Sequence, residues 1–241
     1  MRQAAARSLI AGLLVAAGPP AASGALFQDI ERDDASAVRR ALDAGETTPD
    51  AKVGEPPIPM LAVAARAGSI ELVRLLVSRK ADLDAKTPAG ETAVMLASFV
   101  PDTPGEPGVP PGRVQVEIVR VLVEAGASLE NPGNLTAVSY AAYAGNTEIL
   151  RYLLDRNASP DGGATGEEFR YPTPLAMAVM KGSSEAARLL LERGANPRIK
   201  GPAGEDALGL ARKLNRADLI PPLECAVALG PGERFAERCK R

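Results

Sequence analysis

The residues best suited to chemistry in this sequence are few. There is no histidine, the commonest general base and metal ligand, and two cysteines are too few for a Cys/His zinc site. Acidic clusters occur at Glu31-Arg32-Asp33-Asp34 and Glu167-Glu168, where solvated helix ends or loops are expected. No glycine-rich phosphate loop follows a strand, and Gly-x-Ser-x-Gly is absent. We therefore expect no enzymatic activity, no metal and no cofactor.

The two cysteines allow one pairing. Cys225 and Cys239 are 14 residues apart, and a disulfide between them would fasten the tail 230–241 onto the last helices. Closing a loop of this size contributes up to about 3 kcal/mol in the chain-entropy model. Two unpaired thiols are the alternative, whereas a redox-active pair is disfavoured because no Cys-x-x-Cys occurs. We predict the disulfide.

The N-terminus predicts export. Arg2 and Arg7 accompany an apolar stretch, Ser8 to Ala17, that is too short to cross a bilayer. Gly18-Pro19-Pro20 breaks that stretch, and small residues continue to Ala25. This order is typical of a bacterial leader, here residues 1–25, cleaved near Ala25. An uncleaved anchor and a disordered apolar start are the alternatives. With no later segment long and apolar enough to be a membrane span, we expect the mature chain in the periplasm, which is oxidising.

Composition and charge point to closely packed helices that do not bind nucleic acid. Hydrophobic residues make up 46% of the chain but aromatic residues only 3%, which suits helices better than a sandwich or barrel. The 28 basic and 30 acidic residues include no basic run that could follow a phosphate backbone.

One sequence pattern recurs along the chain. It is a short helix of small apolar residues, followed in the clearest copies by a glycine and a glutamate that begins a second helix. The copies start at Pro59, Thr92, Thr136, Thr173 and, in degenerate form, Asp206. The first two starts and the last two starts are each 33 residues apart, and the other intervals are 44 and 37. Such a period predicts a stack of repeats with two insertions.

The insertions are Val100–Gly112, which is rich in proline, and Gly162–Glu168. Insertions in repeat arrays map to surface loops. Each is interpreted as a tolerated loop, with a specific recognition loop as the alternative.

The second helices end at residues that accept a left-handed backbone. Gly126, Asn157 and Gly194 occupy this place in three units. Lys80 occupies it in another unit, where it should cost some stability. At the ends of the array, we expect a truncated opening helix from Leu26 and a helix-breaking role for Pro221-Pro222.

A 33-residue unit of this kind resembles the ankyrin repeat. Thr173-Pro174-Leu175 matches the family's Thr-Pro-Leu-His motif best, and Gly194-Ala195-Asn196 and Gly126-Ala127 match its Gly-Ala-Asp/Asn ending. The resemblance covers about Leu26 to Leu223. It implies an all-α ankyrin-repeat solenoid of about six helix–turn–helix units with short hairpin loops. The expected units are 26–53, 54–86, 87–130, 131–167, 168–200 and 201–229, before the tail 230–241.

The motif histidine is missing from every copy. Its places are taken by Ala62, Met95, Ser139, Ala176 and Gly209. Polar bonding between units through this residue is therefore not expected, and tighter packing is our conjecture for what compensates.

The resemblance also implies where a partner binds, namely the hairpin tips and the inner helix surface. Four of the chain's eight Phe and Tyr residues fall on this predicted face, and aromatic and Arg side chains dominate interface hot spots. Packing between neighbouring repeats is the alternative for Phe99 and Tyr143. The predicted partner-binding residues are Arg66, Glu91, Phe99, Tyr143, Phe169, Arg170, Tyr171, Met180 and Lys213.

The functional hypothesis is a non-enzymatic protein–protein interaction module in the bacterial periplasm, with an adaptor or protective role. An immunity protein that neutralises a toxin delivered to the periplasm is one alternative, and a structural envelope protein is another. The partner is expected to be another protein, and the unbound chain is expected to be monomeric.

Overall fold

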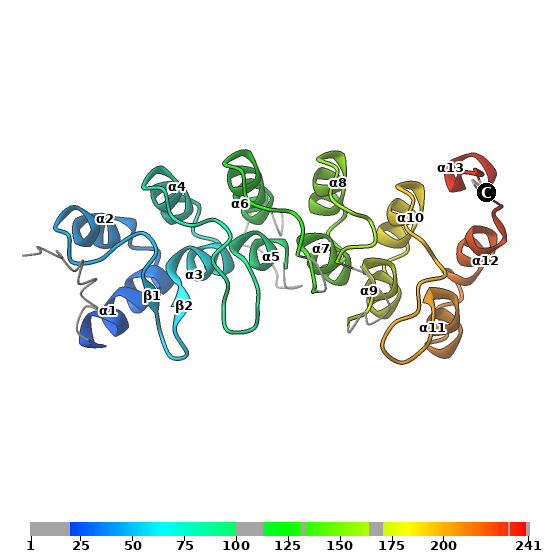
Figure 1. Cartoon of the computed structure of the whole chain (residues 1–241), viewed down its shortest axis with the longest axis horizontal. Coiled ribbons are helices and arrows are strands. Elements are labelled where there is room, and N and C mark those ends of the chain that lie inside the picture. The colour runs from blue at the N-terminus through cyan, green and yellow to red at the C-terminus, as the bar shows by residue number, and fades with distance from the viewer. Residues whose placement is uncertain (1–19, 100–112, 132–133, 164–170, 231, 240–241) are drawn as a thin grey trace, which may run out of the picture.

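The computed structural model describes residues 20–99, 113–131, 134–163, 171–230 and 232–239. Over these residues the chain forms an elongated array of helix pairs (Figure 1). The pairs are α1 (Pro20–Glu31) with α2 (Ala35–Asp43), α3 (Met60–Ala67) with α4 (Ile70–Ser78), α5 (Ala93–Ser98) with α6 (Arg113–Glu124), α7 (Ala137–Ala144) with α8 (Thr147–Asp155), α9 (Pro174–Lys181) with α10 (Ser184–Glu192), and α11 (Ala207–Lys213) with α12 (Ile220–Ala228). A last short helix, α13 (Phe235–Arg238), follows.

The pairs stack side by side in the order of the sequence. The first helices α1, α3, α5, α7, α9 and α11 contact one another consecutively, and so do the second helices α2, α4, α6, α8 and α10 (Figure 1). We call these two rows the inner helices and the outer helices. The stack agrees with an all-α repeat fold, while the count of six ankyrin units stays a prediction. Strand pairing in the described ranges is confined to β1 (Lys52–Val53) and β2 (Ile58–Pro59), which are antiparallel.

The inner helices α7 and α9 begin where the sequence pattern predicts. In α7 and α9 the hydroxyl oxygens of Thr136 and Thr173 accept hydrogen bonds from the backbone N–H groups of Ser139, at 3.4 Å, and Ala176, at 3.2 Å. These bonds satisfy donors that the first helical turn leaves free. After α9, Gly182 adopts φ 80° and its N–H returns to carbonyls of the last turn.

The outer helices hold the aliphatic core. The outer helices α4, α6, α8 and α10 each carry fully buried aliphatic side chains four residues apart, so one face of each helix is apolar. Burying one such side chain contributes about 1.5–3 kcal/mol. The clearest pairs are Leu72 and Leu76, Ile118 and Leu122, and Ile149 and Leu153.

Polar links join neighbouring units on the outer side. Arg79, just after α4, lies 2.6 Å from a carboxylate oxygen of Asp43, and Arg193, just after α10, lies 2.8 Å from one of Asp155. In the loops, Asp84 accepts a hydrogen bond from the backbone N–H of Ser128 at 2.9 Å. Three more carboxylates accept loop N–H groups from the following unit: Asp50 from Asp82, Glu130 from Ser159 and Asp161 from Asn196. The stack is therefore tied at its surface as well as through its core.

Small or apolar side chains occupy the positions of the missing motif histidine. Ala62, Met95, Ser139 and Ala176 are buried. A polar link between units nevertheless exists through Asn131, which sequence reasoning missed. Its side-chain amide donates to the carbonyl oxygen of Leu135 at 3.0 Å, and its amide oxygen accepts from the ammonium of Lys86 at 2.9 Å.

In the full chain α1 begins at Pro20, and an opening helix truncated at Leu26 stays a prediction for the cleaved chain. The expectation about the other end of the array is wrong. Pro221 and Pro222 do not break the last helix, because they lie in the first turn of α12, where a backbone N–H has no helical partner to lose. Both insertions lie largely outside the described residues, and the described part of the chain contains no helix long and apolar enough to cross a membrane.

The C-terminal tail closes the array. Helix α13 contacts both α10 and α12, and Phe235 on α13 is buried. Cys225 on α12 and Cys239 after α13 form a disulfide with Cα atoms 5.9 Å apart, as the sequence predicts. Helix α12 does not lie in line with the outer helices, and α13 packs against α10 instead (Figure 1). The tail thus covers the end of the outer row.

Candidate protein-binding surface

Large apolar side chains are exposed along one row of the described molecule. Phe99, Tyr143, Met180 and Leu214 are each 40–43% exposed. The first three lie at or just after the ends of the consecutive inner helices α5, α7 and α9, where sequence reasoning placed a binding row. Leu214 follows α11 directly. Exposed large apolar side chains that cluster on a surface mark sites of interaction.

The aromatic members of the row touch one another across two units. The ring of Phe99 stacks on that of Tyr143, with centroids 6.2 Å apart and planes 17° apart. Phe99 also meets Tyr140 edge to face, at 6.3 Å and 87°. Phe99 and Tyr143 therefore pack between neighbouring repeats and are exposed at the same time, so the two interpretations of these residues are not exclusive.

A pocket of about 320 Å³ opens beside these rings. Its walls come from the hairpin before α5, from α5 and α7 and from α9, so three successive units build it. The lining side chains are apolar apart from one carboxylate and three hydroxyl groups. The lining residues are Glu91, Leu96, Phe99, Leu135, Ser139, Tyr140, Tyr143 and Met177.

The polar edge of the pocket is built around Glu91. One carboxylate oxygen accepts a hydrogen bond from the phenol of Tyr140 at 2.6 Å, and the other accepts one from the hydroxyl of Thr87 at 3.1 Å. Burial, above all, raises the pKa of Tyr140 well beyond its ordinary value, and the hydrogen bond to Glu91 raises it further. The phenol therefore stays protonated and holds the carboxylate in place.

The structure brings together only part of the predicted site. Glu91, Phe99 and Tyr143 line one pocket, and Tyr171 is close enough to Tyr140 to raise its pKa through the charge it would carry. Met180 is exposed on the next unit. Arg66 and Lys213 are exposed on α3 and α11, beyond the pocket.

Two further details complete the comparison. The ammonium of Lys213 already pairs with Glu205 at 2.9 Å. Phe169 and Arg170 lie outside the described residues. Sequence reasoning missed Tyr140, Leu96 and Met177. The spacing between Tyr140 and Tyr143 on one short helix places both on the same face and could have indicated the first of them.

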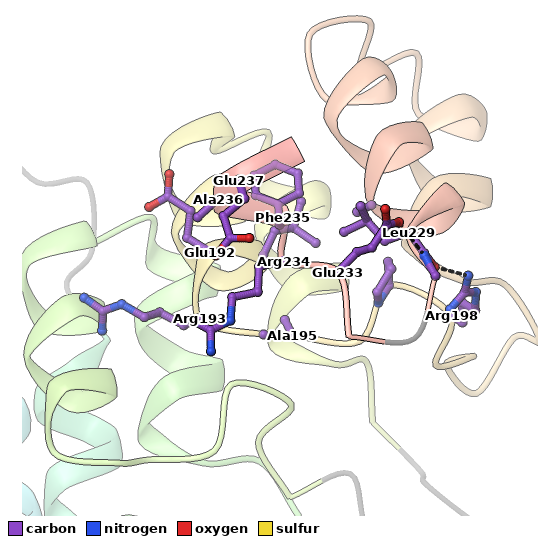
Figure 2. Close-up of a pocket in the computed structure, with 15 residues that line it drawn as sticks. Glu192, Arg193, Ala195, Arg198, Leu229, Glu233, Arg234, Phe235, Ala236 and Glu237 are labelled. Carbon is purple, nitrogen blue, oxygen red and sulfur yellow. Dashed lines mark hydrogen bonds between the residues drawn. The ribbon is translucent and has the colours of Figure 1, made fainter. Parts of the chain in front are cut away.

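A second pocket, of about 630 Å³, lies between the end of α10 and the tail (Figure 2). Three of its charged side chains are engaged in contacts within the fold. Arg193 pairs with Asp155, the guanidinium of Arg198 donates to carbonyl oxygens at the end of α12, and Glu233 accepts from the N–H of Gly230 at 2.8 Å. We interpret this pocket as the space left where the C-terminal tail packs against the end of the array. Among the described residues, no group of three or more Cys, Asp or Glu could hold a metal ion.

Comparison with known protein families identifies the repeating unit. Residues 59–88 match the profile of the ankyrin repeat, and residues 112–201 match the profile of three ankyrin repeats in tandem. The first match spans α3 and α4, and the second spans α6 to α10. No curated protein sequence gives a significant match to the chain.

Proposed function

Because the chain contains ankyrin repeats, which generally mediate protein–protein interaction, we propose that it binds another protein through the face of its inner helices. The observation that supports this most is the exposed row of Phe99, Tyr143 and Met180 on three consecutive units. In this account the protein is a binding module with no chemistry of its own.

The row has the properties of an interface hot spot. Aromatic side chains supply large contact areas at little entropic cost, and the most valuable ones surround pockets that exclude water. Here Glu91 and Thr87 fix Tyr140, and Phe99 stacks on Tyr143, so the surface is ordered before a partner arrives. Such preorganisation reduces the entropy that binding costs.

The setting we propose is the bacterial periplasm, reached by a leader cleaved near Ala25. The disulfide between Cys225 and Cys239 supports an oxidising compartment. Cleavage after Ala25 would shorten α1 but keep its buried residues Leu26 and Ile30. An adaptor or protective role for an exported protein is our first choice. An immunity role predicts that the captured partner is a toxin, and a structural envelope role predicts no tight partner.

Affinity capture from envelope extracts tests this proposal. We compare the wild-type chain with the variant Phe99→Ala/Tyr143→Ala and with Glu117→Ala/Arg151→Ala, whose exposed residues lie on the outer helices α6 and α8. The wild type and the outer variant should retain the same partner, and the aromatic variant should lose it by at least about tenfold, about 1.4 kcal/mol. The bait's intact mass should show a chain that begins near Leu26.

The helical circular dichroism spectrum is the folding control. If the aromatic variant loses the spectrum together with the partner, the two residues belong to the core and the proposed surface is wrong. Equal capture by all three chains would also contradict the proposal, and an uncleaved bait would contradict the export.

A further inference from the structure

We propose that the pocket beside Phe99, Tyr140 and Tyr143 receives a cationic side chain of the partner, a lysine ammonium or an arginine guanidinium. The proposal rests on the proposed function, since it names what the partner inserts at that surface. Its basis is the combination of aromatic faces with a carboxylate that no cation in the described residues neutralises.

Three aromatic rings line the pocket. Phe99 and Tyr143 are nearly parallel, and Tyr140 stands nearly perpendicular to Phe99. A ring face carries negative charge density and attracts a cation within about 6 Å of its centre. The remaining apolar wall, from Leu96, Leu135 and Met177, suits the methylene stem of a lysine or arginine.

Glu91 supplies the counter-charge. Both of its carboxylate oxygens accept hydrogen bonds, but the donors, Tyr140 and Thr87, are neutral hydroxyls. These bonds orient the carboxylate and leave its charge in place. Within the described ranges no lysine or arginine lies within ion-pair distance of it. A neutral apolar side chain in the pocket would displace water from this carboxylate without supplying a hydrogen bond or an opposite charge.

Titration of the full chain with three blocked amino acids, followed by nuclear magnetic resonance, tests the proposal. The probes are the Nα-acetyl methylamides of lysine, arginine and norleucine, the last of which keeps the aliphatic stem but lacks the charge. Lysine or arginine should shift the resonances of Phe99, Tyr140 and Tyr143 with a dissociation constant at least about fivefold smaller than that of norleucine. In Glu91→Gln this preference should disappear.

The exposed Glu117→Gln on α6 is the matched control and should keep the preference. Equal binding of all three probes, absence of binding by lysine and arginine, or a preference unchanged in Glu91→Gln overturns the proposal. None of these results changes the outcome that we expect in the capture experiment, because a partner that inserts a neutral side chain would still need Phe99 and Tyr143. Loss of the proposed function would instead appear as equal capture by the wild type and the aromatic variant.

Discussion

At the scale of single residues, the contact between Tyr140 and Glu91 orders the pocket beside Phe99 and Tyr143. The phenol is half-buried and donates a 2.6 Å hydrogen bond to a carboxylate, a type of bond that is shorter and stronger than one between neutral groups. Tyr140→Phe should destabilise the chain by about 1.5 kcal/mol, because a hydrogen bond to a charged group is lost. Urea unfolding measures this difference, and an unchanged midpoint would contradict it.

The same bond predicts a dependence on pH. The pKa of Tyr140 is raised in the folded chain above the value of 10.0 that an unperturbed tyrosine has. The stability it contributes is therefore fully present below pH 10 and is lost as the pH rises through the folded-state pKa, because the unfolded chain ionises first. The difference in unfolding free energy between wild type and Tyr140→Phe should be constant from pH 7 to 9 and shrink above 10. A difference that grows above pH 10 would contradict the assignment.

The sequence alone predicted the residues Glu91, Phe99 and Tyr143 as candidates, but it did not predict the pocket that they share. The position at the end of each inner helix follows from the repeat, so the exposed row could be found by counting. The stacking of Phe99 on Tyr143 depends on the distance between neighbouring units, and a sequence period does not fix that distance. The link through Asn131 was missed because it follows α6 outside the repeated motif.

At the scale of elements, helix ends follow from local chemistry. Lys80 adopts φ 62° directly after the outer helix α4, in the place where Gly194 adopts φ 87° after α10. Side chains with a Cβ are strained in this region, whereas glycine is not. Lys80→Gly should therefore stabilise the chain by about 0.5–1 kcal/mol, the gain being reduced by the greater freedom of glycine in the unfolded chain.

Lys80→Ala, which keeps the strain, is the control and should stay close to the wild type in urea unfolding. The mirror variant, Gly194→Ala, should lose about 1 kcal/mol. An order in which Lys80→Gly is no more stable than Lys80→Ala would show that the left-handed backbone at this position carries no cost.

Elements were also where sequence reasoning went wrong. Pro221 and Pro222 are incompatible with the interior of a helix but not with its first turn, and the sequence alone did not show where α12 begins. The start of the opening helix at Leu26 is an expectation for the cleaved chain, whereas in the uncleaved chain α1 begins at Pro20.

At the scale of the whole molecule, the main contacts between the described helix pairs join neighbouring units, so a local change should have local effects. The disulfide between Cys225 and Cys239 holds α13 against α10 and α12. Cys225→Ser/Cys239→Ser should release up to about 3 kcal/mol of stabilisation at this end. Hydrogen exchange should quicken at Phe235–Arg238 and in α12 and leave α3 to α7 unchanged, whereas an effect throughout the array would contradict a stack of nearest neighbours.

The central claim is that the inner-helix face, and not the outer one, meets the partner. Photocrosslinking in living cells tests this claim, with p-benzoylphenylalanine in place of exposed Tyr143 on α7 or of exposed Arg151 on α8. The account predicts a discrete crosslinked protein from the Tyr143 position and none from the Arg151 position. A crosslink from the Arg151 position without one from the Tyr143 position would contradict it.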